Sequence, residues 1–380
     1  MKSPGHALRR LGQSLWLDYL HRGLLRSGEL KRLIDADGIS GITTNPTIFD
    51  KAICETGLYD EDIAQLSTQG LNDHQIYQRL VVADVQAAAD LLYPLYEATG
   101  HVDGYVSVEV SPALAYDTQG TIRAAEELWS SIGRPNVLIK IPGTREGLPA
   151  IEHCLQKGIN INITLLFSVQ RYEEVAWLYI RALESRQVGG LSLEGVASVA
   201  SFFVSRVDTW VDKELERLVA EGGLGADEAQ HLTGRAGIAN AKLAYQRFLA
   251  IFSHPRFCRL AEMGARVQRP LWASTSTKNP NYSDVMYVEG LIGPDTVNTV
   301  PPVTLDAFRD HGETRPTLTE GVDEAQYLID RLGELGIDIE EVARQLEHQG
   351  VELFAQSYEH TISSLARRRQ ELTRPGLRRG

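Results

Sequence analysis

One lysine interrupts an apolar run of the chain, Val137-Leu-Ile-Lys-Ile141. If this run is a strand, Lys140 and Leu138 point to one face and the three β-branched residues point to the other. Strands of a parallel sheet are covered on both faces, so we expect Lys140 to be buried. Burial disfavours the ammonium form, and the neutral amine can attack a carbonyl carbon to form an imine. The alternative is a structural lysine that reaches solvent or pairs with a carboxylate.

Three further strand-like runs carry polar residues on a single face. These residues are Ser107 and Glu109 in Tyr105–Val110, Asn160, Asn162 and Thr164 in Ile159–Leu165, and Asp18 at the end of Leu15–Asp18. At the carboxyl ends of barrel strands, where such enzymes place their active sites, Asp18, Glu109 and Thr164 would converge on Lys140. Two carboxyl groups beside an amine supply the proton donors and acceptors that imine chemistry requires. We therefore interpret the four residues as a catalytic cluster, although each one alone could be a hydrogen-bonded structural group.

Eight short runs have the composition of strands, and longer helical patterns separate most of them. The eight runs are Leu15–Asp18, Gly41–Thr43, Tyr105–Val110, Val137–Ile141, Ile159–Leu165, Ala197–Phe203, Leu271–Ser274 and Thr296–Thr299. Within 75–96, apolar residues recur every three or four positions, and Asn72 with Gln75 forms a capping pair before them. Alternating strands and helices predict parallel strands with right-handed crossovers, here an α/β fold with a (β/α)8 TIM barrel. An open doubly wound sheet would usually carry a glycine-rich phosphate loop after its first strand, and the sequence has none.

The last sixty residues show only helical periodicity. We therefore expect one domain over residues 1–380, with a barrel at about 12–315, extra helices, and a helical C-terminal extension at about 320–372. The basic residues of the tail, from Arg367-Arg368-Arg369 to Arg378-Arg379, are interpreted as a solvated helix end rather than a binding patch.

Composition excludes several classes of protein. The 38 basic and 50 acidic residues give a net charge of −12, which argues against a nucleic-acid-binding surface. No apolar run approaches the ~20 residues of a membrane span, and the basic N-terminus lacks the apolar segment of a signal peptide. Three widely separated cysteines fit a reducing, cytoplasmic location. Motifs for ATP, dinucleotides, zinc or a serine nucleophile elbow are missing, so we expect no cofactor and no metal.

Six segments, in order along the chain, resemble motifs of the transaldolases. They are Gly41–Thr47, Val108–Val110 with Tyr116-Asp117, Ile139–Thr144, Asn162–Ser168, Ser201–Arg206 and Ser274–Pro280. The similarity extends from about Leu15 to Gly312, and the helical tail resembles that of the longer bacterial form. On its own, Thr43-Thr44-Asn45-Pro46 could be merely a turn before a helix.

The resemblance implies a role for each matching residue. Lys140 would form the imine with a ketose phosphate, and Asp18 would take a proton from the substrate hydroxyl when the carbon–carbon bond breaks. Glu109 and Thr164 would hold a proton-shuttling water. The binding residues would be Thr43 and Asn45 from the Thr-Thr-Asn-Pro segment, Asn162 and Ser201 around the dihydroxyacetone unit, and Arg206, Ser276 and Lys278 around the phosphate. Many family members have arginine in place of Lys278, and the Ser-Thr-Ser-Thr spacing leaves Ser274 as an alternative to Ser276. Arg206 could instead pair with Asp208.

Phe203 bears on the reaction within this family. The related fructose 6-phosphate aldolases are shorter chains that usually have tyrosine at this position, and phenylalanine donates no proton. This favours transfer of the three-carbon unit to an aldose phosphate over its release. The alternatives are an aldolase-type lyase and a non-enzymatic sugar-phosphate-binding barrel. The partners we expect are sugar-phosphate substrates, with neither nucleic acid nor membrane, in a monomer or homodimer.

Overall fold

A closed barrel of eight parallel strands forms the centre of the molecule. The computed structural model describes residues 3–44, 49–50, 52–53, 56–222 and 226–373. The strands are β1 Gln13–Asp18, β2 Ile39–Thr43, β3 Tyr105–Glu109, β4 Val137–Pro142, β5 Ile161–Leu166, β6 Ser198–Phe203, β7 Arg269–Ala273 and β8 Thr296–Val300. They pair in chain order, and β8 closes the barrel against β1. The predicted (β/α)8 barrel is therefore confirmed, and each predicted strand end lies within two residues of the observed one.

Helices surround the barrel and connect its strands. They are α1 Pro4–Arg10, α2 Arg22–Arg26, α3 Glu29–Asp37, α5 Asp60–Ser67, α6 Asp73–Ala98, the 3-10 helix Pro112–Leu114, α7 Thr118–Ile132, α8 Gly147–Lys157, α9 Val169–Val188, α10 Ser205–Glu221, α11 Ala226–Leu232, α12 Ala236–Phe252, α13 Pro255–Ala261, α14 Met286–Glu289, α15 Pro302–His311, α16 Val322–Glu334 and α17 Ile339–Thr373. Asn72 and Gln75 form the predicted reciprocal cap at the start of α6. Among the helices of the described part of the chain, none combines the length and apolarity that a membrane span requires.

The two faces of the strands have different chemistry. Outward-facing residues such as Ile139 and Ile141 pack under the helices in one apolar layer. Inward-facing residues form a separate layer, in which Trp16, Leu138, Leu271 and Val297 fill the amino-terminal half of the barrel. Polar side chains take over toward the carboxyl ends of the strands, where active sites of such barrels lie. The apolar plug therefore supports a polar chamber above it.

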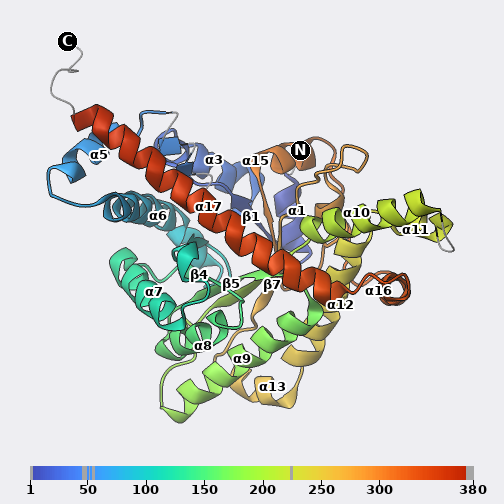
Figure 1. The fold of residues 1–380 in the computed structure, drawn as a ribbon. Coiled ribbons are helices and arrows are strands. Elements are labelled where there is room, and N and C mark those ends of the chain that lie inside the picture. The colour runs from blue at the N-terminus through green and yellow to red at the C-terminus, as the bar shows by residue number, and fades with distance from the viewer. Residues whose placement is uncertain (1–2, 45–48, 51, 54–55, 223–225, 374–380) are drawn as a thin grey trace.

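The C-terminal helix crosses the barrel instead of leaving it. Figure 1 shows α17, in red, running diagonally over the strands from the region of α16 to α5. Arg368 pairs with Asp60 on α5 at 2.5 Å, and Arg369 pairs with Asp73 at the start of α6 at 3.2 Å. The predicted helical extension is confirmed. The basic end is partly exposed to solvent, with 31% of the Arg368 and Arg369 side chains accessible, and both residues also pair with acidic residues distant in sequence; Arg378 and Arg379 lie outside the described residues.

The barrel interior leaves no space for a side chain at Gly41. A Cβ atom built on Gly41 would lie 2.5 Å from the Trp16 ring, which is fully buried. We expect Gly41→Ala to lower the free energy of unfolding by about 1–3 kcal/mol, the usual effect of overpacking a core. Chemical denaturation measures this change. Gly333→Ala in α16 is the control: nothing lies within 4 Å of its added Cβ, so stability should hold or rise by up to about 1 kcal/mol. Equal losses in both variants would contradict the packing argument.

Candidate active site

A cavity of about 210 Å³ opens at the carboxyl ends of the strands. Its lining includes ten of the residues singled out in the sequence: Asp18, Thr43, Lys140, Thr164, Ser201, Phe203, Arg206, Ser274, Ser276 and Lys278. Thr299 and Phe354 also line it. Glu109 and Asn162 lie next to these groups and hydrogen bond to them or their neighbours. Asn45 lies outside the described residues.

Lys140 is held by the pairing of β3 with β4. The register places Glu109 opposite Lys140, and β5 places Asn162 on the other side of Lys140. The Lys140 Nζ donates to Glu109 Oε1 at 2.5 Å and to the Thr44 carbonyl oxygen at 3.0 Å. Only 7% of the lysine side chain and 9% of the glutamate side chain are exposed. The lysine is thus buried, as expected for a reactive amine, and it is also paired with a carboxylate, as expected for a structural lysine. The two features occur together.

Glu109 is suited to carry a proton. Burial raises the pKa of Glu109, while the positive charge of Lys140 and its hydrogen bond act in the opposite direction and Asp18 adds to the rise. Among the described residues, neither the buried Glu109 Oε2 nor the buried Thr164 Oγ1 has a hydrogen-bond partner. Buried polar atoms are rarely left unpaired, and exceptions often mark sites that bind water or ligand. These two atoms are therefore available to a small polar molecule.

The backbone is unusual beside this cluster. Leu165, directly after Thr164, has a φ of +59°, and the pairing of β5 with β6 shifts register between Ile163 and Leu166. Ser274, at the end of β7, has a φ of +55°. Left-handed conformations are costly for residues other than glycine and gather at functional sites. Leu165 follows the cavity residue Thr164, and Ser274 lines the cavity itself, so two of the four positive-φ residues other than glycine in the described chain lie beside the site.

Asp18 is connected to two threonines across the barrel closure. Thr43 donates to Asp18 Oδ1 at 2.7 Å, and the hydroxyl groups of Thr43 and Thr299 are 2.8 Å apart. The chain of hydrogen bonds runs from β1 to β2 and β8, so it fixes the carboxylate at the rim of the cavity. A fixed carboxylate facing a cavity can accept a proton from a bound hydroxyl group.

Asn162 and Ser201 form a second hydrogen-bonded group inside the barrel. Ser201 donates to Asn162 Oδ1 at 2.6 Å, and Asn162 Nδ2 donates to Ser107 Oγ at 3.0 Å. All three residues are buried. These bonds orient the amide and the hydroxyl, and Ser201 is the one that reaches the cavity wall.

Two cations, Arg206 and Lys278, also line the cavity. Burial lowers the pKa of Arg206; partial burial lowers the pKa of Lys278, with the nearby Arg206 charge as the second cause. Among the described residues, neither cation forms an ion pair with a carboxylate. Lys278 Nζ donates to Ser276 Oγ at 2.6 Å, while Ser274 is 2.9 Å from Ser205 Oγ. Unneutralised cations beside hydroxyl groups suit a phosphate group.

The alternative pairing of Arg206 with Asp208 does not occur. Both residues lie in the first turns of α10, but Asp208 turns toward α12 and accepts a hydrogen bond from the Gly237 N–H at 2.7 Å. Arg206 instead lies over the Phe203 ring, 5.4 Å from its centroid. The guanidinium therefore faces the cavity side of the helix.

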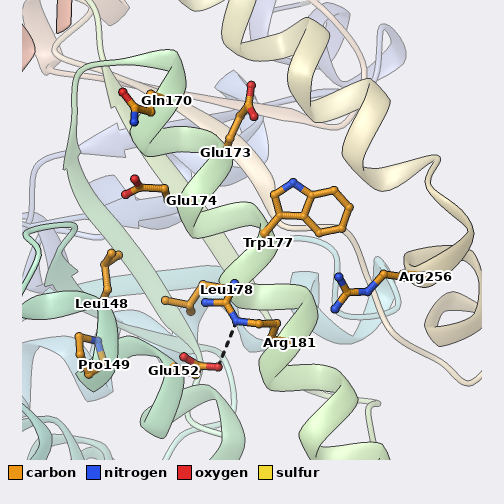
Figure 2. A pocket seen from close by; sticks show the side chains of 10 residues that line it. All are labelled: Leu148, Pro149, Glu152, Gln170, Glu173, Glu174, Trp177, Leu178, Arg181 and Arg256. Atoms are coloured by element: carbon orange, nitrogen blue, oxygen red, sulfur yellow. Dashed lines mark ion pairs between the residues drawn. The ribbon is translucent and has the colours of Figure 1, made fainter.

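A larger cavity of about 610 Å³ lies on the outer flank of α8 and α9. Figure 2 shows its lining, in which Trp177 faces Arg256 from α13 and Arg181 pairs with Glu152. Arg256 is also paired, with Glu184 at 2.6 Å. Its cations are neutralised and its lining has no lysine, so size alone does not make it the active site. Across the described residues, His, Cys, Asp and Glu side chains nowhere gather in threes as a metal site would require.

Fold and site together define a (β/α)8 barrel built around a buried lysine with acid groups beside it. Residues 15–365 match the family described as transaldolase/fructose-6-phosphate aldolase, and the chain belongs to that family. It is 48% identical over 364 residues to Transaldolase 2 of Nostoc sp. strain PCC 7120, covering 94% of this chain and 95% of that one. Identity is also 48% to transaldolase of Thiobacillus denitrificans, covering 94% and 98%, and to transaldolase of Mycobacterium tuberculosis, covering 94% of each chain.

The sequence patterns did not indicate every residue of the cavity. Thr299 lies on a strand that was weakly marked, although its phase with Val297 could have placed it inside the barrel. Phe354 lies in the helical pattern of the last sixty residues, and such a pattern does not show what the helix covers. Ser274 was noted only as an alternative to Ser276, and both line the cavity.

The buried Asp208 gives a test of how α10 is held. Only 1% of Asp208 is exposed, and burial raises its pKa from 3.8 to about 6. A raised folded-state pKa gives a contribution to stability that is complete below about pH 4 and lost as pH rises through about 6. Asparagine keeps an acceptor for Gly237 but does not ionise. Relative to wild type, Asp208→Asn should therefore gain up to about 3 kcal/mol in unfolding free energy between about pH 4 and pH 8.

Urea denaturation at several pH values measures this difference. Asp330→Asn, on the exposed face of α16, is the matched control and should show no such rise. A gain for Asp208→Asn that does not change with pH would show that ionisation of this carboxyl is not the cause.

Proposed function

We propose that the protein is a transaldolase. It transfers a dihydroxyacetone unit from sedoheptulose 7-phosphate or fructose 6-phosphate to erythrose 4-phosphate or glyceraldehyde 3-phosphate, in the non-oxidative pentose phosphate pathway of the cytoplasm. The observation that carries the proposal is the buried Lys140 bonded to Glu109 beside a cavity that is also lined by two cations, Arg206 and Lys278, without an ion-pair partner among the described residues. Membership of the family and 48% identity to proteins named transaldolase support it.

The reaction begins with an imine on Lys140. The Lys140 ammonium first passes a proton to Glu109, to which it is hydrogen-bonded, and its neutral amine then attacks the ketose carbonyl carbon. The resulting carbinolamine loses its hydroxyl group as water, and Glu109 returns its proton for that departure; burial, which raises the pKa of Glu109, favours the protonated form that this requires. A water held by Glu109 and Thr164 relays protons in both directions. The unpaired Glu109 Oε2 and Thr164 Oγ1 are the atoms that would hold it.

Carbon–carbon cleavage follows from the iminium ion. Asp18 accepts the proton of the substrate hydroxyl, the C–C bond breaks, and its electron pair flows into the iminium to leave an enamine on Lys140. The first aldose departs. The enamine then attacks the aldehyde carbon of the acceptor, Asp18 returns the proton to the new alkoxide, and water hydrolyses the imine to free Lys140.

The remaining residues hold the substrate. Thr43, Asn45, Asn162 and Ser201 bind the dihydroxyacetone unit. In support, Asn162 accepts a hydrogen bond from Ser201 and donates one to Ser107, and the two bonds orient its amide. Arg206, Ser276 and Lys278 bind the phosphate. Ser276 is preferred to Ser274 because it contacts Lys278, whereas Ser274 is bonded to Ser205.

Transfer is favoured over release by the side chain at the end of β6. Phe203 lines the cavity and packs against Phe167, with ring centroids 5.1 Å apart. A phenyl ring gives no proton to the enamine, so the enamine persists until an acceptor aldehyde arrives. A fructose 6-phosphate aldolase-type lyase is the alternative function. We further propose that residues 1–380 form one domain, acting as a monomer or homodimer.

Borohydride trapping tests the imine. Incubation with fructose 6-phosphate and sodium borohydride should add a reduced dihydroxyacetone to Lys140, detected by mass spectrometry of peptides. Glu152→Gln, in the larger cavity, is the control and should trap like wild type. A protein that forms no adduct would be a sugar-phosphate binder and neither enzyme. Omitting erythrose 4-phosphate from the assay then separates transferase from lyase: product formation that does not require this acceptor favours the lyase.

Glu109→Gln tests the acid–base role. Glutamine fills the same volume and keeps an oxygen for Lys140, but it neither gives nor takes a proton. Imine formation in single-turnover trapping should slow by about 100-fold or more, the usual loss for a general acid–base group. Glu152→Gln again serves as the matched control. An unchanged rate in Glu109→Gln would mean that Glu109 only neutralises the lysine.

A further inference from the structure

Arg206 lies against two phenylalanine rings that come from distant parts of the chain. Its guanidinium carbon is 5.4 Å from the centroid of Phe203, at the end of β6, and 5.9 Å from the centroid of Phe354, on α17. Phe354 is half-buried and lines the same cavity as Lys140. The C-terminal helix thus contributes a side chain to the cavity that the barrel motifs do not contain.

The two rings partly compensate the positive charge of the guanidinium, as a carboxylate partner would otherwise do. A half-buried cation without a counter-ion is costly, and the negative face of an aromatic ring offsets part of that cost. Arginine tends to stack its flat guanidinium face on aromatic rings, an arrangement that leaves the in-plane N–H groups free. Those N–H groups are the ones that bind phosphate oxygens in a fork. A carboxylate partner would compete with phosphate for them, whereas a ring does not.

A glycine in α17 allows this helix to pack closely against Arg206. Gly350 lies one helical turn before Phe354, so the two residues share a face. A Cβ atom on Gly350 would lie 2.9 Å from Leu165 Cδ2 and 3.5 Å from Arg206 Nη1. Glycine therefore lets the helix lie close to the end of β5 and to Arg206. The ion pair of Arg368 with Asp60 ties the far end of the helix down.

We propose that Phe354 is a positioning residue that fixes the plane of Arg206 and thereby sets the preference for phosphorylated over unphosphorylated ketoses. The proposal rests on the proposed function, in which Arg206 binds the substrate phosphate. Phe354 does not touch the reacting carbons. It acts on the end of the substrate that stays unchanged, so its effect belongs in binding and not in the chemical steps.

Phe354→Ala tests this assignment, with Phe354→Tyr as the rescue and Leu353→Ala as the matched control. Leu353 is the neighbouring residue of α17 and is 52% exposed. In Phe354→Ala, calorimetric titration should show inorganic phosphate binding about tenfold more weakly, the size of effect a partly desolvated cation–π contact supports. The KM for fructose 6-phosphate should rise by a similar factor with kcat nearly constant, and turnover of unphosphorylated fructose should not change. Phe354→Tyr and Leu353→Ala should both behave as wild type.

Two results would overturn the assignment: unchanged phosphate affinity in Phe354→Ala, or an equal loss of turnover with both sugars. Thermal unfolding checks that each variant is folded; Phe354→Leu, which keeps apolar bulk but has no ring face, replaces alanine if that variant unfolds and carries the same expectation. Phosphate titration needs no turnover. An inactive wild type would thus count against the transaldolase proposal, while weaker phosphate binding in Phe354→Ala would still support the role of Phe354.

Discussion

The pair of Lys140 and Glu109 is the interaction on which the rest of the structure depends. Taking an ammonium and a carboxylate out of water costs several kcal/mol for each ion, and only close contact with further hydrogen bonds offsets that cost. The register of β3 against β4 gives the contact, and the Thr44 carbonyl adds a second acceptor for the lysine. A slip of one residue in that register would turn one of the two charges into the apolar layer beneath the helices and leave the other unpaired in the barrel. The requirement to keep this pair together therefore constrains both strands.

Much of this arrangement is predictable because parallel barrel strands obey two simple rules. Side chains alternate between faces, and both faces are covered. Those rules are enough to recognise Lys140, Glu109 and Thr164 as inward-facing residues in runs that are otherwise apolar. They also place all eight strands, including weak ones such as β7 and β8, since the helical stretches between them leave little choice of position.

What the sequence does not predict depends on contacts between distant elements. The ion pairs of Arg368 and Arg369 are an example: the path of α17 brings these residues to Asp60 and Asp73, about three hundred residues earlier. The place of Phe354 in the cavity is also unpredictable from the sequence. An amphipathic pattern shows that a helix packs against the protein, but it does not show which residues it packs against. Likewise, the choice of Gly237 over Arg206 as the partner of Asp208 follows from how α12 packs on α10, which no local pattern records.

The plug formed by Trp16, Leu138, Leu271 and Val297 has a consequence for the order of events. Because these side chains fill the barrel below Lys140, the chamber has its opening at the strand carboxyl ends, partly covered by α17. In the proposed transfer, the departing aldose and the incoming aldose must therefore pass through the same opening of the cavity. In the proposed mechanism the two sugars occupy the cavity one after the other, and the three-carbon unit stays on Lys140 between them, which is a ping-pong sequence.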